Sequence, residues 1–164
     1  MNIRNARIEE LDEVIRVIVA AYDQYAALVS PEMWAPYARN VADVRSRLDE
    51  SELIVAEEDG RILGAVTFYP DASVSRGEGW PQSYSGIRVL AVHPDARGLG
   101  LGRILTQECI RRSRDLGVQY VGLHTTEFMS VARGMYERMG FERAPEFDFR
   151  PGPGVLVMAY RLAL

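Results

Sequence analysis

Hydrophobic residues recur along the chain with two spacings, one typical of strands and one typical of helices. Short apolar segments rich in β-branched and aromatic residues predict strands at residues 2–8, 53–56, 62–69, 87–92 and 120–124. Hydrophobic residues three or four positions apart predict helices at residues 11–22, 37–48, 101–116 and 129–139. Two further apolar segments, 141–149 and 155–162, flank a Pro-Gly-Pro-Gly turn and predict a closing hairpin.

Turn and breaker residues fall between these segments. Asp59-Gly60 predicts a tight turn between the second and third strands, and Gly117 predicts the end of the third helix. Pro31 and Pro36 predict a break over residues 25–36. The order of elements is therefore βααβββαβαββ, which predicts an α/β protein with a mixed sheet and helices on its faces. We expect one domain over residues 1–164.

Composition narrows the functional classes. The chain is 48% hydrophobic and 26% charged, and no apolar segment is long enough to cross a membrane. No secretory signal is visible, so we expect a cytoplasmic protein with no membrane partner. The net charge of -4 argues against general nucleic-acid binding, although Arg97, Arg103, Arg111, Arg112 and Arg114 form a locally basic segment. Cys109 is the one cysteine, so neither a disulfide nor a zinc site is expected.

The segment Arg97-Gly98-Leu99-Gly100-Leu101-Gly102 follows a predicted strand and begins a predicted helix. Glycine lets the backbone approach a ligand closely, and successive N–H groups at a helix N-terminus favour phosphate. Arg97 and Arg103 would add charge-assisted hydrogen bonds. The alternative interpretation is an ordinary tight turn.

Two other phosphate-binding loops do not fit. A dinucleotide loop needs G-x-G-x-x-G after the first strand of a βαβ unit, whereas position 103 is Arg103 and the segment comes late in the chain. A P-loop needs a glycine-lysine pair, and the chain has no lysine.

The chain resembles the GNAT superfamily of N-acetyltransferases, whose signature for the acetyl-CoA pyrophosphate is R/Q-x-x-G-x-G/A. Arg97, Gly100 and Gly102 match this signature. Val89-Leu90-Ala91-Val92-His93-Pro94 resembles the family's fourth strand, and Tyr136-Glu137-Arg138-Met139-Gly140-Phe141 resembles its Y-E-R/K-x-G-F segment. The resemblance covers nearly the whole chain. It implies a mostly antiparallel mixed sheet of about seven strands, splayed between strands 4 and 5.

The resemblance also implies roles for individual residues. The Leu90 N–H would stabilise the charge that develops on the thioester oxygen, and Tyr136 would protonate the departing CoA thiolate. A thiol of pKa about 8.5 leaves readily, so the tyrosine helps without being indispensable. The residues implied in binding acetyl-CoA are Leu90, Ala91, Val92, Arg97, Gly98, Leu99, Gly100, Leu101, Gly102 and Arg103.

An acceptor amine of pKa about 10.4 is almost wholly protonated at pH 7 and needs a base. A water chain to backbone carbonyls, or an acceptor with a lower pKa, would need none. Many relatives place a glutamate on the fourth strand, but this chain has Gly86 at the aligned position. The candidates to replace it are His124, Glu78 and Glu127. We rank His124 first, because its unperturbed pKa of about 6.5 suits proton transfer at neutral pH. Its alternative role is a structural hydrogen bond.

Other candidate residues have simpler interpretations. Cys109 is expected to pack in the core. Tyr22, Tyr25, Trp34 and Tyr37 would wall the acceptor pocket or pack in the core. Asp148 and Arg150 could also reach that pocket, although exposed charges are the ordinary expectation for them.

The sequence therefore predicts an acetyl-CoA-dependent N-acetyltransferase that acts on a primary amine by direct attack in a ternary complex, without a metal. An acyl-CoA sensor or partner-binding module is the alternative that Gly86 keeps open. A nucleotide-binding oxidoreductase is a third option. The acceptor is not identified by the sequence, which also leaves the oligomeric state open, with a homodimer as one option.

Overall fold

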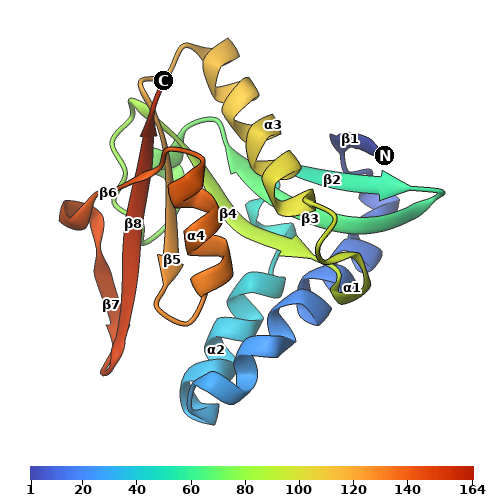
Figure 1. The fold of residues 1–164 in the computed structure, drawn as a ribbon, viewed down its shortest axis with the longest axis horizontal. Helices are drawn as coiled ribbons and strands as arrows, with labels where there is room; N and C mark the ends of the chain where they lie inside the picture. The colour runs from blue at the N-terminus through green and yellow to red at the C-terminus, as the bar shows by residue number, and fades with distance from the viewer. The chain divides into compact units, whose positions relative to one another are not determined.

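The computed structural model describes all 164 residues, and its helices and strands alternate as the hydrophobic pattern predicts (Figure 1). The strands are β1 Asn2–Asn5, β2 Glu52–Glu58, β3 Arg61–Tyr69, β4 Tyr84–Val92, β5 Tyr120–Thr126, β6 Glu142–Arg143, β7 Phe149–Gly152 and β8 Val155–Ala163. The α-helices are α1 Leu11–Tyr22, α2 Pro31–Ala42, α3 Leu101–Leu116 and α4 Ser130–Arg138. None of these helices is both long and apolar enough to span a membrane.

The strands pair in the order β1-β2-β3-β4-β5-β8-β6, with β7 also paired to β8. The β4–β5 pair is parallel, while β8 runs antiparallel to β5, β6 and β7. This mixed α/β architecture confirms the predicted fold class, with eight strands instead of about seven. Backbone contacts divide the chain into two compact units, Met1–Thr67 with Val89–Glu108 and Phe68–Arg88 with Cys109–Leu164. The single domain over residues 1–164 stays a prediction.

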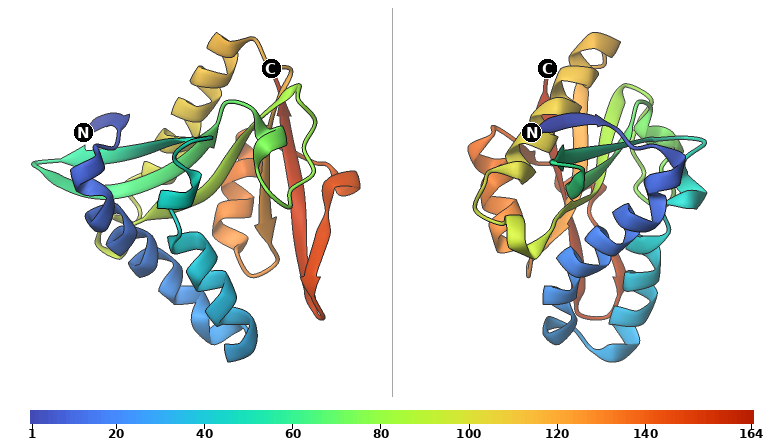
Figure 2. Two further views of the ribbon diagram at one scale, coloured as in Figure 1. Left: turned by 180° about the vertical axis from the view of Figure 1, so that it is seen from behind. Right: turned by 90° about the vertical axis from the view of Figure 1, so that its right-hand side faces the viewer.

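In the first unit, β1 pairs antiparallel with β2, and Asp59-Gly60 turns β2 into β3 with a positive φ at both residues. Consecutive residues of β2 and β3 are buried, which is typical of strands covered on both faces. Figure 2 shows α1 on one face of these strands and the start of α3 on the other. Leu105 of α3 reaches to 3.1 Å from the Cβ position of Gly64, so glycine permits this close packing.

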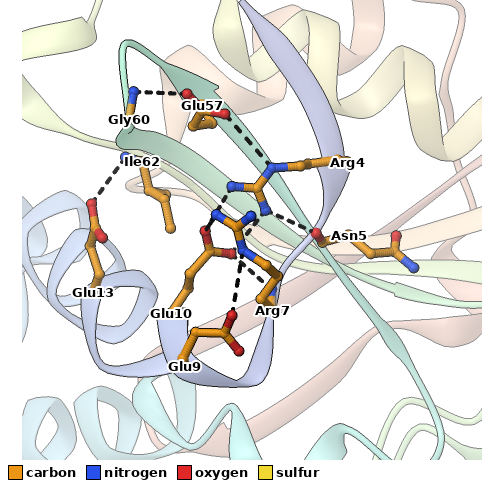
Figure 3. A network of polar contacts seen from close by, with 9 residues as sticks. All are labelled: Arg4, Asn5, Arg7, Glu9, Glu10, Glu13, Glu57, Gly60 and Ile62. Atoms are coloured by element: carbon orange, nitrogen blue, oxygen red, sulfur yellow. Dashed lines mark hydrogen bonds and ion pairs between the residues drawn. The ribbon is translucent and has the colours of Figure 1, made fainter.

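A polar network ties β1 to the segment before α1 (Figure 3). Arg4 donates two hydrogen bonds to the Glu10 carboxylate, at 2.9 and 2.7 Å, and the Arg7 backbone N–H donates to Glu10 at 2.8 Å. The Arg4 and Arg7 contacts lower the pKa of Glu10 to about 2. Glu57 of β2 accepts from the Gly60 N–H at 2.9 Å, which fixes the hairpin turn.

In the second unit, the β4–β5 ladder runs from the Tyr84–Tyr120 pair to the Ile87–Leu123 pair. The ladder between β5 and β8 continues three residues further, through His124 to Thr126. The early end of the β4–β5 ladder agrees with the predicted splay between strands 4 and 5. Helix α4 packs on one face of β5, and the yellow-green segment between β3 and β4 covers the other face (Figures 1 and 2).

Two predicted segments were wrong. The break expected over residues 25–36 is shorter, because α2 begins at Pro31 and contains Pro36. Proline fits the first position of a helix, where its missing N–H needs no partner. The strand expected over residues 141–149 is divided into β6, a 3₁₀ turn at Pro145–Phe147, and β7.

Candidate functional site

The glycine loop begins at a well-anchored strand end in the first unit. The His93 N–H donates to the Leu63 carbonyl at 2.8 Å, and His93 Nδ1 accepts from the Asp95 N–H at 3.2 Å. Ala96, which follows, is buried. These contacts fix the point from which the backbone turns toward α3.

Gly98 and Gly100 have φ of 82° and 76°, in the left-handed region. No atom lies within 4 Å of a Cβ added at either position. The backbone conformation, and not a shortage of space, is therefore what favours glycine there. Leu101, at 2% exposure, anchors the first turn of α3, whereas Leu99 is exposed.

The start of α3 presents unpaired backbone donors. The Ile104 N–H donates to the Gly100 carbonyl at 3.1 Å, which is the bond that starts the helical pattern. The N–H groups of Leu101, Gly102 and Arg103 precede that bond, so they have no acceptor within the helix. Together with the helix dipole they favour an anion. This is the arrangement that the sequence predicts for a pyrophosphate cradle.

Arg97 and Arg103 of the loop are exposed. Arg97 donates a long hydrogen bond of 3.4 Å to the Ala21 carbonyl at the end of α1. Its charge also opposes the rise in the pKa of Tyr25 that burial causes. The Arg97 side chain thus lies toward α1, a contact that the sequence did not predict.

The strand before the loop carries a backbone irregularity. Val89 has φ of 53°, a conformation that a β-branched residue rarely adopts. Leu90 and Val92 are half-buried, while Ala91 is buried. A residue with positive φ interrupts the regular alternation of a strand, and strain of this kind concentrates at functional sites. The oxyanion role of the Leu90 N–H stays a prediction.

Tyr136 lies in α4, in the second unit. Its side chain is 5% exposed and its ring packs edge-on against Phe141, with the centroids 5.6 Å apart. The Phe141 N–H donates to the Tyr136 carbonyl at 3.0 Å and closes the helix end. Tyr136 therefore has a fixed position, and its acid role stays a prediction.

His124 lies on β5 with both ring nitrogens facing protein atoms. Nε2 is 2.8 Å from the Phe147 carbonyl oxygen. Nδ1 is buried without a hydrogen bond and is 3.7 Å from Oε2 of Glu78. The side chain is 6% exposed. The structural hydrogen bond considered from the sequence is thus present.

Glu78 is nearly buried, at 9% exposure. Its Oε2 accepts a hydrogen bond from the Trp80 indole Nε1 at 3.0 Å, and its Oε1 lies 3.8 Å from Nε of Arg88. The structure therefore brings together two of the three candidate bases, Glu78 and His124. The third, Glu127, is exposed. Trp80 and Arg88 were not predicted as site residues, because nothing in the sequence places them beside a carboxylate.

The missing strand glutamate has a structural explanation. Gly86 and Gly122 are paired across β4 and β5. A Cβ at Gly86 would lie 3.1 Å from the Ala72 Cβ, and a Cβ at Gly122 would lie 2.8 Å from the Trp80 ring. The segment between β3 and β4 therefore occupies the space that side chains on the two strands would need.

Tyr136, in α4, and His124, on β5, lie on opposite sides of the β5 strand. Trp80 packs against Gly122, and its ring centroid is 4.9 Å from that of His124, two residues further on the same face. Helix α4, with Tyr136, covers the other face (Figures 1 and 2). Tyr136 is thus separated from Glu78 and His124 by the sheet.

Of the expectations for other residues, the burial of Cys109 is confirmed, while the choice between pocket wall and core for the four aromatic residues stays a prediction. Tyr22, Tyr25, Trp34 and Tyr37 form one aromatic cluster, with neighbouring ring centroids 5.8 to 6.1 Å apart. Cys109 is fully buried.

Arg150 is exposed as expected, but Asp148 is not. Asp148 accepts two hydrogen bonds from Arg143, at 2.7 and 2.6 Å, and one from the Ala159 N–H at 2.7 Å. The Arg143 contact is the main reason why the pKa of Asp148 is lowered. Asp148 thus joins the segment before β7 to β8.

Part of the chain is similar in sequence to mycothiol acetyltransferases. The chain is 37% identical over 119 residues to a mycothiol acetyltransferase of Cellulomonas flavigena, covering 68% of this chain and 34% of the relative. It is 33% identical over 141 residues to a mycothiol acetyltransferase of Rhodococcus jostii, covering 83% and 43% respectively. The chain thus spans less than half the length of these relatives.

Solved structures share the fold. The PaiA N-acetyltransferase of Thermoplasma acidophilum, in complex with coenzyme A, matches with a TM-score of 0.74 at 18% identity, covering 98% of both chains. A ribosomal-protein-alanine N-acetyltransferase of Brucella melitensis matches with a TM-score of 0.69 at 22% identity, covering 100% of both chains.

The sequence model of the acetyltransferase (GNAT) family matches residues 16–141, which is most of the chain. The matched segment contains β4, the glycine loop, α3 and Tyr136. The chain therefore belongs to the GNAT family of acetyltransferases.

Proposed function

We propose that this chain transfers the acetyl group of acetyl-CoA to a primary amine, by direct attack in a ternary complex. The observation that carries the proposal is the glycine loop, in which two left-handed glycines precede the free N–H groups of α3. Such a helix N-terminus suits the pyrophosphate of CoA. Membership of the GNAT family identifies CoA as the phosphate ligand to test first.

The reaction would use groups that the chain already holds in place. The Leu90 N–H, next to the irregular Val89, would donate to the oxyanion that forms on the thioester. Tyr136 would protonate the thiolate as it leaves. His124, the first-ranked base from the sequence, lies beside a second candidate base, Glu78.

The acceptor remains to be identified by experiment. The two curated relatives are named for mycothiol, and one of the structural neighbours is named for a ribosomal-protein alanine. A panel of amines would include small amines, amino acids and a peptide with an N-terminal alanine. It would also include an unacetylated precursor of mycothiol, because relatives are named mycothiol acetyltransferase. Release of the CoA thiol is the readout. Cys109, the one cysteine, is fully buried and adds little background to a thiol assay.

The test has two arms. Calorimetry with CoA is expected to show binding, and thiol release that depends on both acetyl-CoA and an amine is expected for at least one acceptor. Absence of CoA binding would contradict the proposal. Binding without turnover across the whole panel would favour the alternative of an acyl-CoA sensor, which Gly86 keeps open.

A further inference from the structure

The position that lacks a strand glutamate is filled by a segment that brings another glutamate. Ala72 and Trp80, at the two ends of this segment, pack against Gly86 and Gly122. Glu78 lies two residues before Trp80 and is held by the indole N–H. The same packing that leaves little space for a side chain at Gly86 therefore places a carboxylate on that face of β4 and β5.

The contacts of His124 assign it a supporting position. A carbonyl oxygen only accepts, so Nε2 carries the proton in its 2.8 Å contact with Phe147. Nδ1 is buried and directed at Glu78. Both nitrogens thus face protein groups, and neither presents a lone pair to a ligand. His124 is thus suited to holding the carboxylate.

Glu78 keeps one oxygen available. Trp80 and His124 both face Oε2, while Oε1 has only the Arg88 guanidinium, 3.8 Å away. Arg88 also donates to the Ser75 hydroxyl at 3.4 Å. An acceptor ammonium is a cation with N–H donors, which a carboxylate oxygen is suited to bind.

Few other charged groups face this pair. Asp148, from the segment before β7, interacts electrostatically with His124 but is bound to Arg143. Trp80, Phe147 and Phe149 cover the His124 ring and the space around it with apolar surface. The charges that act on the pair are therefore those of Arg88 and Asp148.

We propose that Glu78 is the catalytic base of the acetyl transfer, and that His124 and Trp80 are positioning residues that hold its carboxylate. This inference rests on the function proposed above. The ammonium of the acceptor transfers one proton to Oε1 of Glu78, directly or through one water. The neutral nitrogen then forms a bond to the thioester carbon. The C–S bond breaks, the thiolate takes up a proton equivalent to the second one lost by nitrogen, and Glu78 releases its proton to solvent.

The central test compares Glu78→Gln with wild type at a series of pH values. The carboxamide keeps the size of the side chain but cannot accept the proton, so kcat/KM for the amine is expected to fall about 10²-fold or more at pH 7. The acidic limb of the pH profile is expected to disappear. Glu146→Gln is the matched control, because Glu146 is an exposed glutamate of the same unit, and its activity is expected to stay at the wild-type level.

Two further variants separate the roles. His124→Gln is expected to lower kcat while leaving the affinity for CoA unchanged, and to move the acidic limb without abolishing it. Glu78→Asp restores a carboxylate on a shorter side chain, and part of the lost activity is expected to return. CoA affinity and the thermal unfolding midpoint of each variant show that it is folded.

An NMR measurement tests the contact without turnover. The chain has two histidines, His93 and His124, so a His93→Gln variant assigns both ring signals. Glu78→Gln is expected to shift the His124 Nδ1 signal and to leave that of His93 unchanged. An unchanged His124 signal would contradict the pairing.

The outcomes distinguish this inference from the proposed function. If wild type releases thiol with an amine, but Glu78→Gln does so equally well and with the same pH profile, the inference alone is wrong. If wild type binds no CoA or acetylates no amine, the proposed function and the inference are both wrong.

Discussion

Gly86 and Gly122 face each other across the β4–β5 pair, where a Cβ at Gly122 would clash with the Trp80 ring at 2.8 Å and a Cβ at Gly86 would make a tight contact with the Ala72 Cβ at 3.1 Å. Because these two positions have no side chain, the segment between β3 and β4 lies directly on the backbone of the two strands. Close packing of this kind makes the segment sensitive to a single added carbon.

Gly122→Ala is accordingly expected to destabilise the protein by about 1–3 kcal/mol, because its Cβ would meet the Trp80 ring at 2.8 Å. Activity is expected to fall as Trp80 and Glu78 move. Chemical denaturation measures the first effect and thiol release the second. Gly134→Ala is the control, since its Cβ would meet only the end of the flexible Arg138 side chain and alanine favours a helix. Equal stability of the two variants would contradict this account.

Gly98→Ala is expected to weaken CoA binding. A non-glycine residue in the left-handed region costs roughly 1–2 kcal/mol, so the loop would change conformation and its N–H groups would turn away from the ligand. Gly60→Ala is the matched control, because Gly60 has φ of 78° and equally open surroundings, but lies in the β2–β3 turn. Calorimetry with CoA should show a raised Kd for Gly98→Ala only. The same Kd for both variants would remove the loop from the donor site.

Tyr136→Phe is expected to lower kcat by about 10- to 100-fold, at the lower end of the range for acid catalysis, because a thiolate is a tolerable leaving group. The KM for acetyl-CoA should change little. Tyr160→Phe is the control: Tyr160 is also buried, and its hydroxyl donates to Glu137 at 2.8 Å. Full turnover in Tyr136→Phe would remove the acid role.

Glu10→Gln tests the network at the N-terminus (Figure 3). Contacts with Arg4 and Arg7 lower the pKa of Glu10 from 4.5 to about 2, so its stabilising effect is complete above about pH 4.5 and is lost as the pH falls toward 2. The variant is expected to unfold about 2–4 °C below wild type at pH 7, equivalent to about 1 kcal/mol. The difference should shrink in acid. Glu9→Gln, at an exposed glutamate, should match wild type at both pH values. A difference that is constant with pH would rule out this assignment.

Local pattern predicted most of the fold. The apolar spacing located every α-helix approximately, and the glycine loop was recognised from its position between a strand and a helix. The start of α2 was predicted wrongly, since Pro31 occupies the first position of this helix instead of marking a break. The closing hairpin was misjudged because the contact of Asp148 with Arg143 and β8 is tertiary and leaves no periodic signal.

The candidate site was only partly predictable for the same reason. The sequence showed that Gly86 stands where relatives have a glutamate. It did not show that Ala72 lies next to the space a side chain there would need, because that contact is tertiary. Glu78 and His124 are 46 positions apart and belong to different elements, so no local pattern indicates that they meet. Chemical type alone favoured His124 as the base, and the hydrogen bond between its Nε2 and the Phe147 carbonyl could not be foreseen from the sequence.

The strained backbone at Val89 bears on how the stability and the activity of this protein could be changed by mutation. A valine held at φ of 53° costs of order 1–3 kcal/mol, which a glycine or asparagine at this position would partly relieve. Directed evolution for heat resistance alone would therefore tend to replace Val89 and regularise the strand beside Leu90. With the Leu90 N–H acting as proposed, selection for turnover would oppose the same change, and a library screened for both properties would show the conflict at position 89.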